Sequence, residues 1–144
     1  MEVSQLKKDE TTVRVRYKDT DQMGVAYYAN YLVWFEVGRT EMMRSLELPY
    51  REFEKSNIYL PVLKAFCEYK QPACYDDRLT IVTRLESLNN VRLVFNYEIK
   101  REDEILAAGY TEHAFVNNNG RPVVLKKFSP FLWNRLCQAL EKQD

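Results

Sequence analysis

Two carboxylates, Asp19 and Asp21, lie in a polar segment that reads D-T-D-Q-M-G and leads into a strongly patterned apolar stretch. A carboxylate can accept a proton from water or attack a carbonyl carbon as a nucleophile. A helix that begins just after it offers unpaired N–H groups, and the positive end of its dipole, to an oxygen that becomes negative during reaction. The segment could therefore hold a site for a ligand whose oxygen becomes negative during reaction, although the spacing alone is also explained by two loop-forming Asx-turn residues.

The apolar stretch that follows predicts one long helix, from about residue 30 to residue 46. We expect Asn30 to be its N-cap, because the Asn30 side chain can accept a hydrogen bond from a free amide of the first turn. Pro49 cannot continue a helix, so the helix should end shortly before it. The predicted buried face is marked by side chains at steps of three and four, namely Tyr31, Phe35, Gly38, Met42 and Ser45.

Before and after this helix, apolar side chains recur at every second residue, a pattern that predicts the strands of an antiparallel sheet. The first residues of the strand after the helix are apolar on both faces, which predicts that this part is covered on both sides. Pro61 lies in the same strand and indicates a sheet edge or a bulge, because proline cannot donate a ladder hydrogen bond. The expected strands are a short one at 11–17 and four long ones in a meander at about 58–69, 78–88, 91–99 and 104–116.

A terminal helix is expected to start with Ser129 as its cap and Pro130 at its first position. The order of elements shows no alternation of strand and helix, so a parallel doubly wound sheet is not expected. The sequence instead predicts an α+β domain in which the long helix lies along a curved five-stranded antiparallel sheet. One helix cannot cover such a sheet alone, and the exposed edges predict a partner subunit.

The composition argues against several classes of protein. The 144 residues include 21 basic and 21 acidic side chains, so no basic field predicts nucleic-acid binding. No apolar run is long enough for a membrane span, and the first residues lack a signal-peptide core, so we expect a cytoplasmic protein. Three cysteines without metal-ligand spacing and a single histidine, His113, predict neither a metal site nor a cofactor.

The segment from Arg16 to Glu41, R-Y-K-D-T-D-Q-M-G-V-A-Y-Y-A-N-Y-L-V-W-F-E-V-G-R-T-E, resembles the signature of small bacterial acyl-CoA thioesterases with the hotdog fold. It is similar to the 4-hydroxybenzoyl-CoA thioesterase group and to the related Tol–Pal-cluster-associated enzymes. The start of a strand in that family is also similar to residues 72–81 of this chain, which read P-A-C-Y-D-D-R-L-T-I. The resemblance covers about residues 12–128 and implies a single hotdog domain over 1–144, with a helix wrapped by the sheet. It also implies homodimers that join two sheets, often paired into homotetramers, with active sites at the dimer interface.

The resemblance assigns roles to three residues. The catalytic aspartate of the family corresponds to Asp21, and the backbone amide that polarises the thioester carbonyl corresponds to Tyr28. A tyrosine found in part of the family corresponds to Tyr17, which could orient Asp21 or the substrate. Many relatives carry a histidine where this chain has Tyr28, so only the main-chain role is carried over. Asp19 is expected to order the loop, and Glu36 on the helix is a reserve candidate for the catalytic acid.

The function implied by the resemblance is hydrolysis of an acyl-CoA thioester to a free acid and CoA, without a cofactor. The alternative is a hotdog module that binds acyl-CoA or an acyl carrier and has lost turnover. Possible contacts for the CoA phosphates are Lys64, Lys70, Arg84 and Arg92. Possible wall residues of an acyl slot are Met23, Val25, Tyr27, Tyr31, Trp34 and Phe35.

Overall fold

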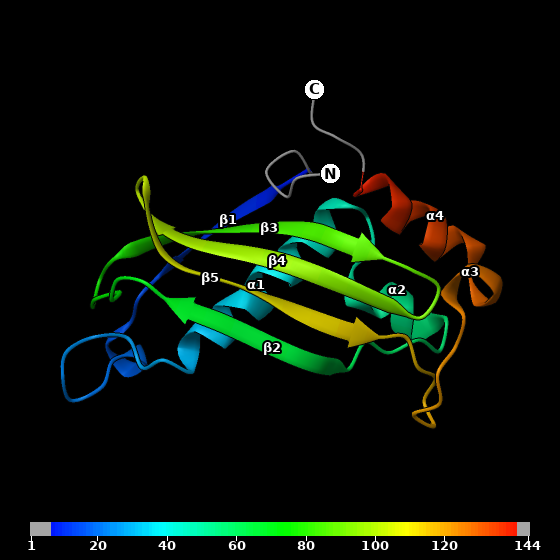
Figure 1. Cartoon of the computed structure of the whole chain (residues 1–144), viewed down its shortest axis with the longest axis horizontal. Coiled ribbons are helices and arrows are strands. Elements are labelled where there is room, and N and C mark those ends of the chain that lie inside the picture. Colours follow the sequence, from blue (N-terminus) through cyan, green and yellow to red (C-terminus); the bar gives the residue numbers. More distant parts are fainter. Residues whose placement is uncertain (1–6, 141–144) are drawn as a thin grey trace.

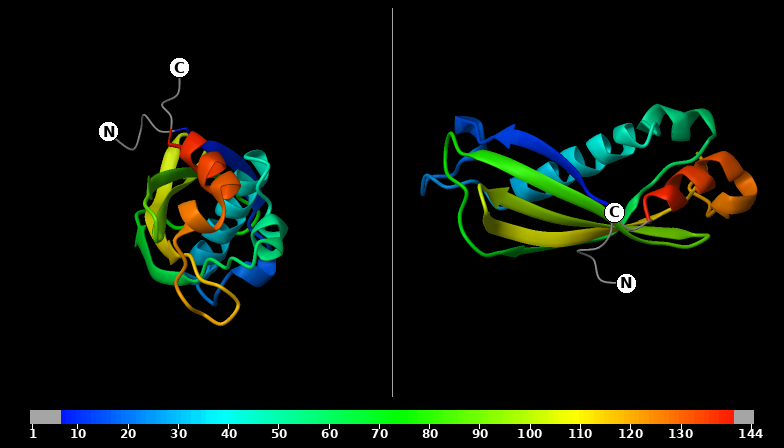
Figure 2. Two further views of the ribbon diagram at one scale, coloured as in Figure 1. Left: turned by 90° about the vertical axis from the view of Figure 1, so that its right-hand side faces the viewer. Right: turned by 90° about the horizontal axis from the view of Figure 1, so that it is seen from above.

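A five-stranded antiparallel sheet curls around one long helix in the computed structural model, which describes residues 7–140 (Figure 1). The end-on view in Figure 2 shows the helix inside the curve of the sheet. The predicted α+β hotdog architecture is therefore confirmed. The elements are β1 (Asp9–Arg14), a short 3₁₀ helix (Tyr17–Asp19), α1 (Asn30–Ser45), α2 (Tyr50–Lys55), β2 (Val62–Tyr69), β3 (Arg78–Leu88), β4 (Arg92–Arg101), β5 (Glu104–Ala114), α3 (Leu125–Phe128) and α4 (Pro130–Gln138).

The strand order in the sheet is β1-β3-β4-β5-β2. The strands β3, β4 and β5 form the predicted meander, but β2 does not precede them in it: it pairs with β5 at the far edge. The chain reaches β2 only after α1, which runs across the concave face from the end of β2, where the Tyr31 ring packs on Tyr69, to the edge at β1, where Ser45 lies beside Asp9 (Figure 1). The β2–β5 register places Val62 opposite His113 and Tyr69 opposite Ala107.

The core lies between α1 and the concave face of the sheet. Along β4 the predicted alternation is confirmed, because Leu93, Phe95, Tyr97 and Ile99 are all buried. The Phe35 ring from α1 stacks on Tyr97, with ring centroids 4.2 Å apart and planes 6° from parallel. Such apolar contacts, together with the burial of large rings, supply most of the stabilisation of a core like this one.

Two glycines allow the backbone to approach this core closely. A Cβ placed on Gly38 of α1 would lie 2.4 Å from Thr83 Oγ1, so a larger residue would push the helix off the sheet. A Cβ on Gly109 of β5 would lie 2.0 Å from the Phe66 carbonyl oxygen of β2. Glycine at these positions therefore keeps α1 on the sheet and β2 on its edge.

Three local predictions were wrong. The first strand ends at Arg14, and Tyr17 lies in the 3₁₀ helix, because the Asp19 carboxylate accepts a hydrogen bond from the Arg16 N–H and turns the chain. Ala29, not Asn30, is the N-cap of α1, and the Asn30 amide instead donates to the Asp19 carbonyl at 2.8 Å. The strand after α1 was predicted to start at Ile58 with both faces covered; Ile58 is fully buried, but β2 begins only at Val62, where Val62 and Leu63 are 48% and 44% exposed.

The helices at the end of the chain follow the prediction in part. Ser129 caps α4, since its Oγ accepts a hydrogen bond from the Leu132 N–H at 3.4 Å, and Pro130 is the first helical residue. The short α3 was not predicted. Within residues 7–140, no helix is both long and apolar enough to cross a membrane.

Candidate active site

The loop before α1 is held by Asp19. Its carboxylate accepts from the Arg16 N–H at 2.8 Å, and its carbonyl oxygen accepts from the Tyr27 N–H and from the Asn30 side-chain amide, each at 2.8 Å. These contacts tie the start of the loop to the start of the helix. The expectation that Asp19 orders the loop is therefore confirmed.

Asp21 lies at the tip of the same loop and is exposed. Its Oδ1 accepts from the Met23 N–H at 2.8 Å, and its carbonyl oxygen accepts from the Gly24 N–H at 3.0 Å. Gly24 has a φ of +80°, a conformation that glycine adopts without strain. The second carboxylate oxygen, Oδ2, makes no hydrogen bond within the described part of the chain. Asp21 thus closes an Asx turn with one oxygen and keeps the other available for chemistry.

Asp21 and Tyr28 line one cleft of about 340 Å³. The cleft lies where the loop, the approach to α1 and the end of β2 meet. Its base is formed by Tyr31, which is buried and whose hydroxyl accepts from the Ala73 N–H at 3.1 Å. The residues that line this Asp21 cleft are Asp21, Val25, Ala26, Tyr28, Tyr31, Tyr69, Lys70, Gln71 and Pro72.

The main chain of Tyr28 is fixed at the approach to the helix. Its carbonyl oxygen accepts from the Tyr69 hydroxyl at 3.0 Å and from the Tyr31 N–H at 3.3 Å. Its own N–H donates to no protein group among residues 7–140. An N–H at the start of a helix, free of a partner and aided by the helix dipole, is a suitable donor to a developing oxyanion.

The two other tyrosines of the cleft are neutral at ordinary pH. Desolvation raises the pKa of Tyr69 to about 12, with a further contribution from the nearby Cys67 thiol. Burial also raises the pKa of Tyr31, against a hydrogen bond from Ala73 that lowers it. The charged side chains of the Asp21 cleft are therefore Asp21 and Lys70 alone.

Tyr17 does not line the Asp21 cleft. Its ring is 74% exposed and packs against Tyr75, with centroids 5.9 Å apart. Its carbonyl oxygen accepts from the Thr20 N–H and hydroxyl and so helps to shape the loop. A direct role of the Tyr17 side chain at Asp21 stays a prediction.

Of the four cations expected near CoA phosphates, Lys70 lies at the Asp21 cleft. Arg84 is nearly buried against Glu98, at 3.1 Å, and Arg92 pairs with Glu112 at 3.2 Å across the sheet. Lys70 is thus the member of this set that lines the Asp21 cleft, and its Nζ also lies 3.7 Å from Glu68 Oε1.

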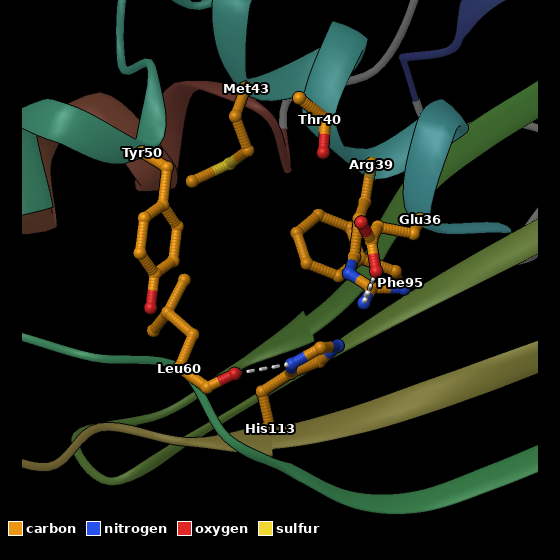
Figure 3. Close-up of a pocket in the computed structure, with 8 residues that line it drawn as sticks. All are labelled: Glu36, Arg39, Thr40, Met43, Tyr50, Leu60, Phe95 and His113. Atoms are coloured by element: carbon orange, nitrogen blue, oxygen red, sulfur yellow. Dashed lines mark hydrogen bonds and ion pairs between the residues drawn. The ribbon is translucent and has the colours of Figure 1, made fainter. Parts of the chain in front are cut away.

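A second cleft, of about 420 Å³, lies at the other half of α1 (Figure 3). It shares no lining residue with the Asp21 cleft. The reserve candidate Glu36 belongs to it, which separates Glu36 from Asp21 within one chain. Sequence reasoning missed this second cleft, which we call the Arg39 cleft, because its residues come from distant segments. The residues that line the Arg39 cleft are Glu36, Arg39, Thr40, Met43, Tyr50, Leu60, Phe95 and His113.

His113 is 1% exposed and forms part of a chain of hydrogen bonds beneath the Arg39 cleft. Its Nδ1 lies 3.0 Å from the Leu60 carbonyl oxygen, and its Nε2 lies 2.8 Å from Thr111 Oγ1. Thr111 Oγ1 lies 2.6 Å from the Tyr97 hydroxyl. Burial lowers the pKa of His113 to about 4, against the Leu60 carbonyl that raises it, while the Arg39 charge lowers it further. The imidazole is therefore neutral at pH 7.

This burial makes stability depend on pH. The unfolded chain binds a proton at His113 below its ordinary pKa of 6.5, whereas the native state does so only near pH 4, so stability falls as pH drops from 6.5 to 4. The expected loss is about 3 kcal/mol, at 1.36 kcal/mol for each pKa unit. Denaturant unfolding at pH 7 and pH 4 should show this extra loss in the natural chain relative to His113→Gln. Parallel pH curves for the two chains would contradict it.

Residues 7–140 contain no group of three or more His, Cys, Asp or Glu side chains placed to hold a metal ion.

Comparison with known proteins agrees with this fold. Residues 15–136 match the thioesterase-like superfamily. YneP of Bacillus subtilis is 35% identical over 132 residues, which cover 90% of this chain and 95% of that protein. The acyl-CoA thioester hydrolase YbgC of Escherichia coli O157:H7 is 37% identical over 94 residues, covering 65% of this chain and 70% of YbgC. The solved DHNA-CoA thioesterase of Staphylococcus aureus has a TM-score of 0.87 at 30% identity, covering 91% of this chain and 89% of that one.

The fold and these matches define a thioester hydrolase of the hotdog class. The chain belongs to the thioesterase-like superfamily.

Proposed function

We propose that this protein hydrolyses an acyl-CoA thioester to a free acid and CoA. One observation carries the proposal: the free Oδ2 of Asp21 and the unpartnered N–H of Tyr28 belong to residues of the same cleft. The first can activate water or attack the carbonyl, and the second can hold the oxyanion that forms. The names of two relatives, the acyl-CoA thioester hydrolase YbgC and the DHNA-CoA thioesterase, support a CoA thioester as substrate.

Two routes use the same residues. As a general base, Asp21 takes a proton from water while the hydroxide portion attacks the thioester carbon; the C–S bond then breaks, and the CoA thiolate receives the proton. As a nucleophile, Asp21 attacks the same carbon, releases the CoA thiolate and forms a mixed anhydride, which water hydrolyses to the acid and free Asp21. In both routes the Tyr28 N–H donates to the carbonyl oxygen while it carries negative charge.

We also propose that the protein acts as a homo-oligomer built on the edge strand β2. An exposed strand edge presents unpaired N–H and C=O groups, and here it also carries apolar side chains. Val62, Leu63, Phe66 and Tyr69 are 48%, 44%, 48% and 46% exposed. A two-fold axis beside β2 would pair the strand with its own copy in antiparallel orientation and extend the sheet into a second chain. A further pairing into tetramers remains an expectation from the resemblance.

Charging this edge should separate the subunits. Phe66→Glu places a carboxylate where two copies would meet, so we expect the dimer dissociation constant to rise at least about tenfold, the effect of 1.4 kcal/mol. Phe131→Glu on α4 is the matched control, because Phe131 is 58% exposed but lies away from β2. Sedimentation velocity over a dilution series would measure the dimer dissociation constants of both variants. Unchanged association of Phe66→Glu, with an unchanged thermal melt, would remove β2 from the interface.

The alternative is a module that binds acyl-CoA or an acyl carrier without turnover. The free oxygen of Asp21 and the free N–H of Tyr28 favour the enzyme, because a pure binding site needs neither. Thiol release from acyl-CoA, measured beside equilibrium binding of the same compounds, tests the choice. Cytoplasmic action remains our expectation, and the free cysteines among the described residues fit a reducing compartment.

A further inference from the structure

The Tyr69 hydroxyl ties the approach to α1 to the end of β2. Its oxygen lies 3.0 Å from the Tyr28 carbonyl oxygen, and the two residues are 41 positions apart in the sequence. A carbonyl oxygen can only accept, so the phenol donates its single proton to Tyr28. This hydrogen bond therefore holds, from the sheet, the main chain of the residue whose N–H we expect to stabilise the oxyanion.

The segment just before α1 is not held in place by burial of its side chains. The Tyr27 and Tyr28 side chains are 47% and 62% exposed, so neither ring anchors the main chain in the core. Hydrogen bonds hold it instead: the Tyr27 N–H donates to the Asp19 carbonyl at 2.8 Å, and the Asn30 N–H donates to the Tyr27 carbonyl at 2.9 Å. Both bonds lie within the loop and the helix start, so they shape the local turn but do not join it to the sheet.

Tyr69 is itself fixed well enough to act as an anchor. It is the last residue of β2, where its main chain pairs with Ala107 of β5. Its ring packs edge-on against the buried ring of Tyr31, with centroids 4.9 Å apart and planes at 89°. Strand pairing and this aromatic contact hold the ring, so its hydroxyl extends from a defined position.

Loss of the Tyr69 hydroxyl would leave the Tyr28 carbonyl with one weaker partner. The remaining donor is the Tyr31 N–H, at 3.3 Å, which is longer than an ordinary N–H···O hydrogen bond. The exposed segment could then shift relative to the rest of the Asp21 cleft. A displacement of about 1 Å in a group that meets the reacting atoms can cost about a hundredfold in rate.

The Tyr69 hydroxyl is not available as a proton donor to the substrate. Its one proton is already donated to the Tyr28 carbonyl. Desolvation raises the pKa of Tyr69 to about 12, and the nearby Cys67 thiol raises it further, so the phenol also stays protonated at neutral pH. Any effect of this hydroxyl on catalysis must therefore act through Tyr28.

We propose that Tyr69 is a positioning residue for the reaction at the Asp21 cleft, and that its hydroxyl holds the Tyr28 main chain so that the Tyr28 N–H meets the oxyanion. The inference rests on the proposed function for the reaction that is catalysed. It implies that removal of the hydroxyl weakens binding of the transition state more than binding of the substrate, because the N–H acts chiefly once the oxygen carries charge.

Tyr69→Phe removes the hydroxyl and keeps the ring that packs on Tyr31. Its kcat should fall at least about tenfold while the Michaelis constant changes less than about twofold. The loss should be the same from about pH 6 to about pH 9, because a positioning group does not titrate in the reaction. The matched control is Tyr110→Phe, since Tyr110 is a surface tyrosine of β5 whose hydroxyl makes no hydrogen bond within residues 7–140. An unchanged kcat in Tyr69→Phe would overturn the proposal.

A double-mutant cycle shows whether Tyr69 acts through the Tyr28 N–H. In the Tyr28→Pro background, where that N–H is absent, Tyr69→Phe should lower kcat less than about twofold, because coupled residues are not additive. In the Tyr28→Phe background, which keeps the N–H, it should still cost at least about tenfold. The same cost in the Tyr28→Pro and natural backgrounds would mean that Tyr69 acts by another route and would contradict the inference.

The hydrogen bond can also be followed without turnover. The Ala29 nitrogen shares a peptide group with the Tyr28 carbonyl, so its ¹⁵N amide signal should respond when the Tyr69 donor is lost. In ¹⁵N-labelled protein, the amide signals of Tyr28 and Ala29 should move in Tyr69→Phe and stay in place in Tyr110→Phe. Unmoved signals in Tyr69→Phe would show that the hydroxyl does not hold the Tyr28 main chain.

Turnover distinguishes this inference from the function on which it rests. Thiol release that depends on Asp21 but is equally fast in Tyr69→Phe would overturn the inference and leave the proposed function standing. Moved Tyr28 and Ala29 signals in Tyr69→Phe, with no thiol release by the natural chain from any acyl-CoA, would overturn the function and leave Tyr69 as the residue that fixes the approach to α1.

Discussion

Replacing Asp21 with asparagine should lower kcat for thioester hydrolysis at least about a hundredfold, the usual contribution of a positioned acid–base group. The amide can neither take a proton from water nor attack the carbonyl carbon. It keeps an oxygen that can accept from the Met23 N–H, so the turn of the loop should persist. A loss of turnover with an unchanged melting temperature would therefore separate catalysis from the structural role of the Asx turn.

Asp76→Asn is the matched control for this variant, because Asp76 is an exposed aspartate in the loop between β2 and β3. Its turnover should equal that of the natural chain. Asp19→Ala should mainly loosen the loop, because it removes the oxygen that accepts from the Arg16 N–H. Equal turnover by Asp21→Asn and the natural chain would mean that Asp21 is not the catalyst, and Glu36 would be the next residue to test.

Replacing Tyr28 with proline should lower kcat about a hundredfold to a thousandfold, the cost of removing one oxyanion donor. Proline deletes the N–H that we expect to stabilise the oxyanion. The Tyr28 carbonyl, which accepts from the Tyr69 hydroxyl, remains in place. The Michaelis constant should change far less than kcat, because the donor acts chiefly once the oxygen carries charge.

Tyr28→Phe is the control that isolates the main chain from the side chain. It keeps the N–H and the ring, so its kcat should lie within a few-fold of the natural value. Thermal melts of both variants would show whether proline disturbs the start of α1. A large loss in Tyr28→Phe, with a small one in the folded Tyr28→Pro, would assign the role to the hydroxyl and contradict the oxyanion assignment.

The sequence predicted the fold well where one element carries a strong local pattern. The apolar side chains of α1 recur at helical spacing, and β4 alternates cleanly, so both were found from local period alone. The position of β2 was not predictable in this way, because β2 pairs with β5, a strand that lies far from it in the sequence. The start of β2 was predicted to be covered because its side chains are apolar on both faces, but Val62 and Leu63 are exposed in the chain.

The candidate site, like the fold, could be predicted only where its residues lie close together in the sequence. Asp21 and Tyr28 lie within eight residues of each other, and one continuous motif predicts that they share a cleft, as they do. The Arg39 cleft joins side chains of α1, β4 and β5 that no local pattern connects. A signal was present in the single histidine, which lies in a predicted strand and is buried. Its partners Thr111 and Tyr97 could be identified only from the register of the sheet.

The measurement that tests the central claim most directly is release of free thiol by the natural chain from short, long and aromatic acyl-CoAs, with binding of each compound measured in parallel. We predict that at least one acyl-CoA yields CoA and free acid in equal amounts, under conditions in which Asp21→Asn binds the same compound without releasing thiol. Binding of acyl-CoA by the natural chain with no thiol released from any member would contradict the account and would make the protein a binding module.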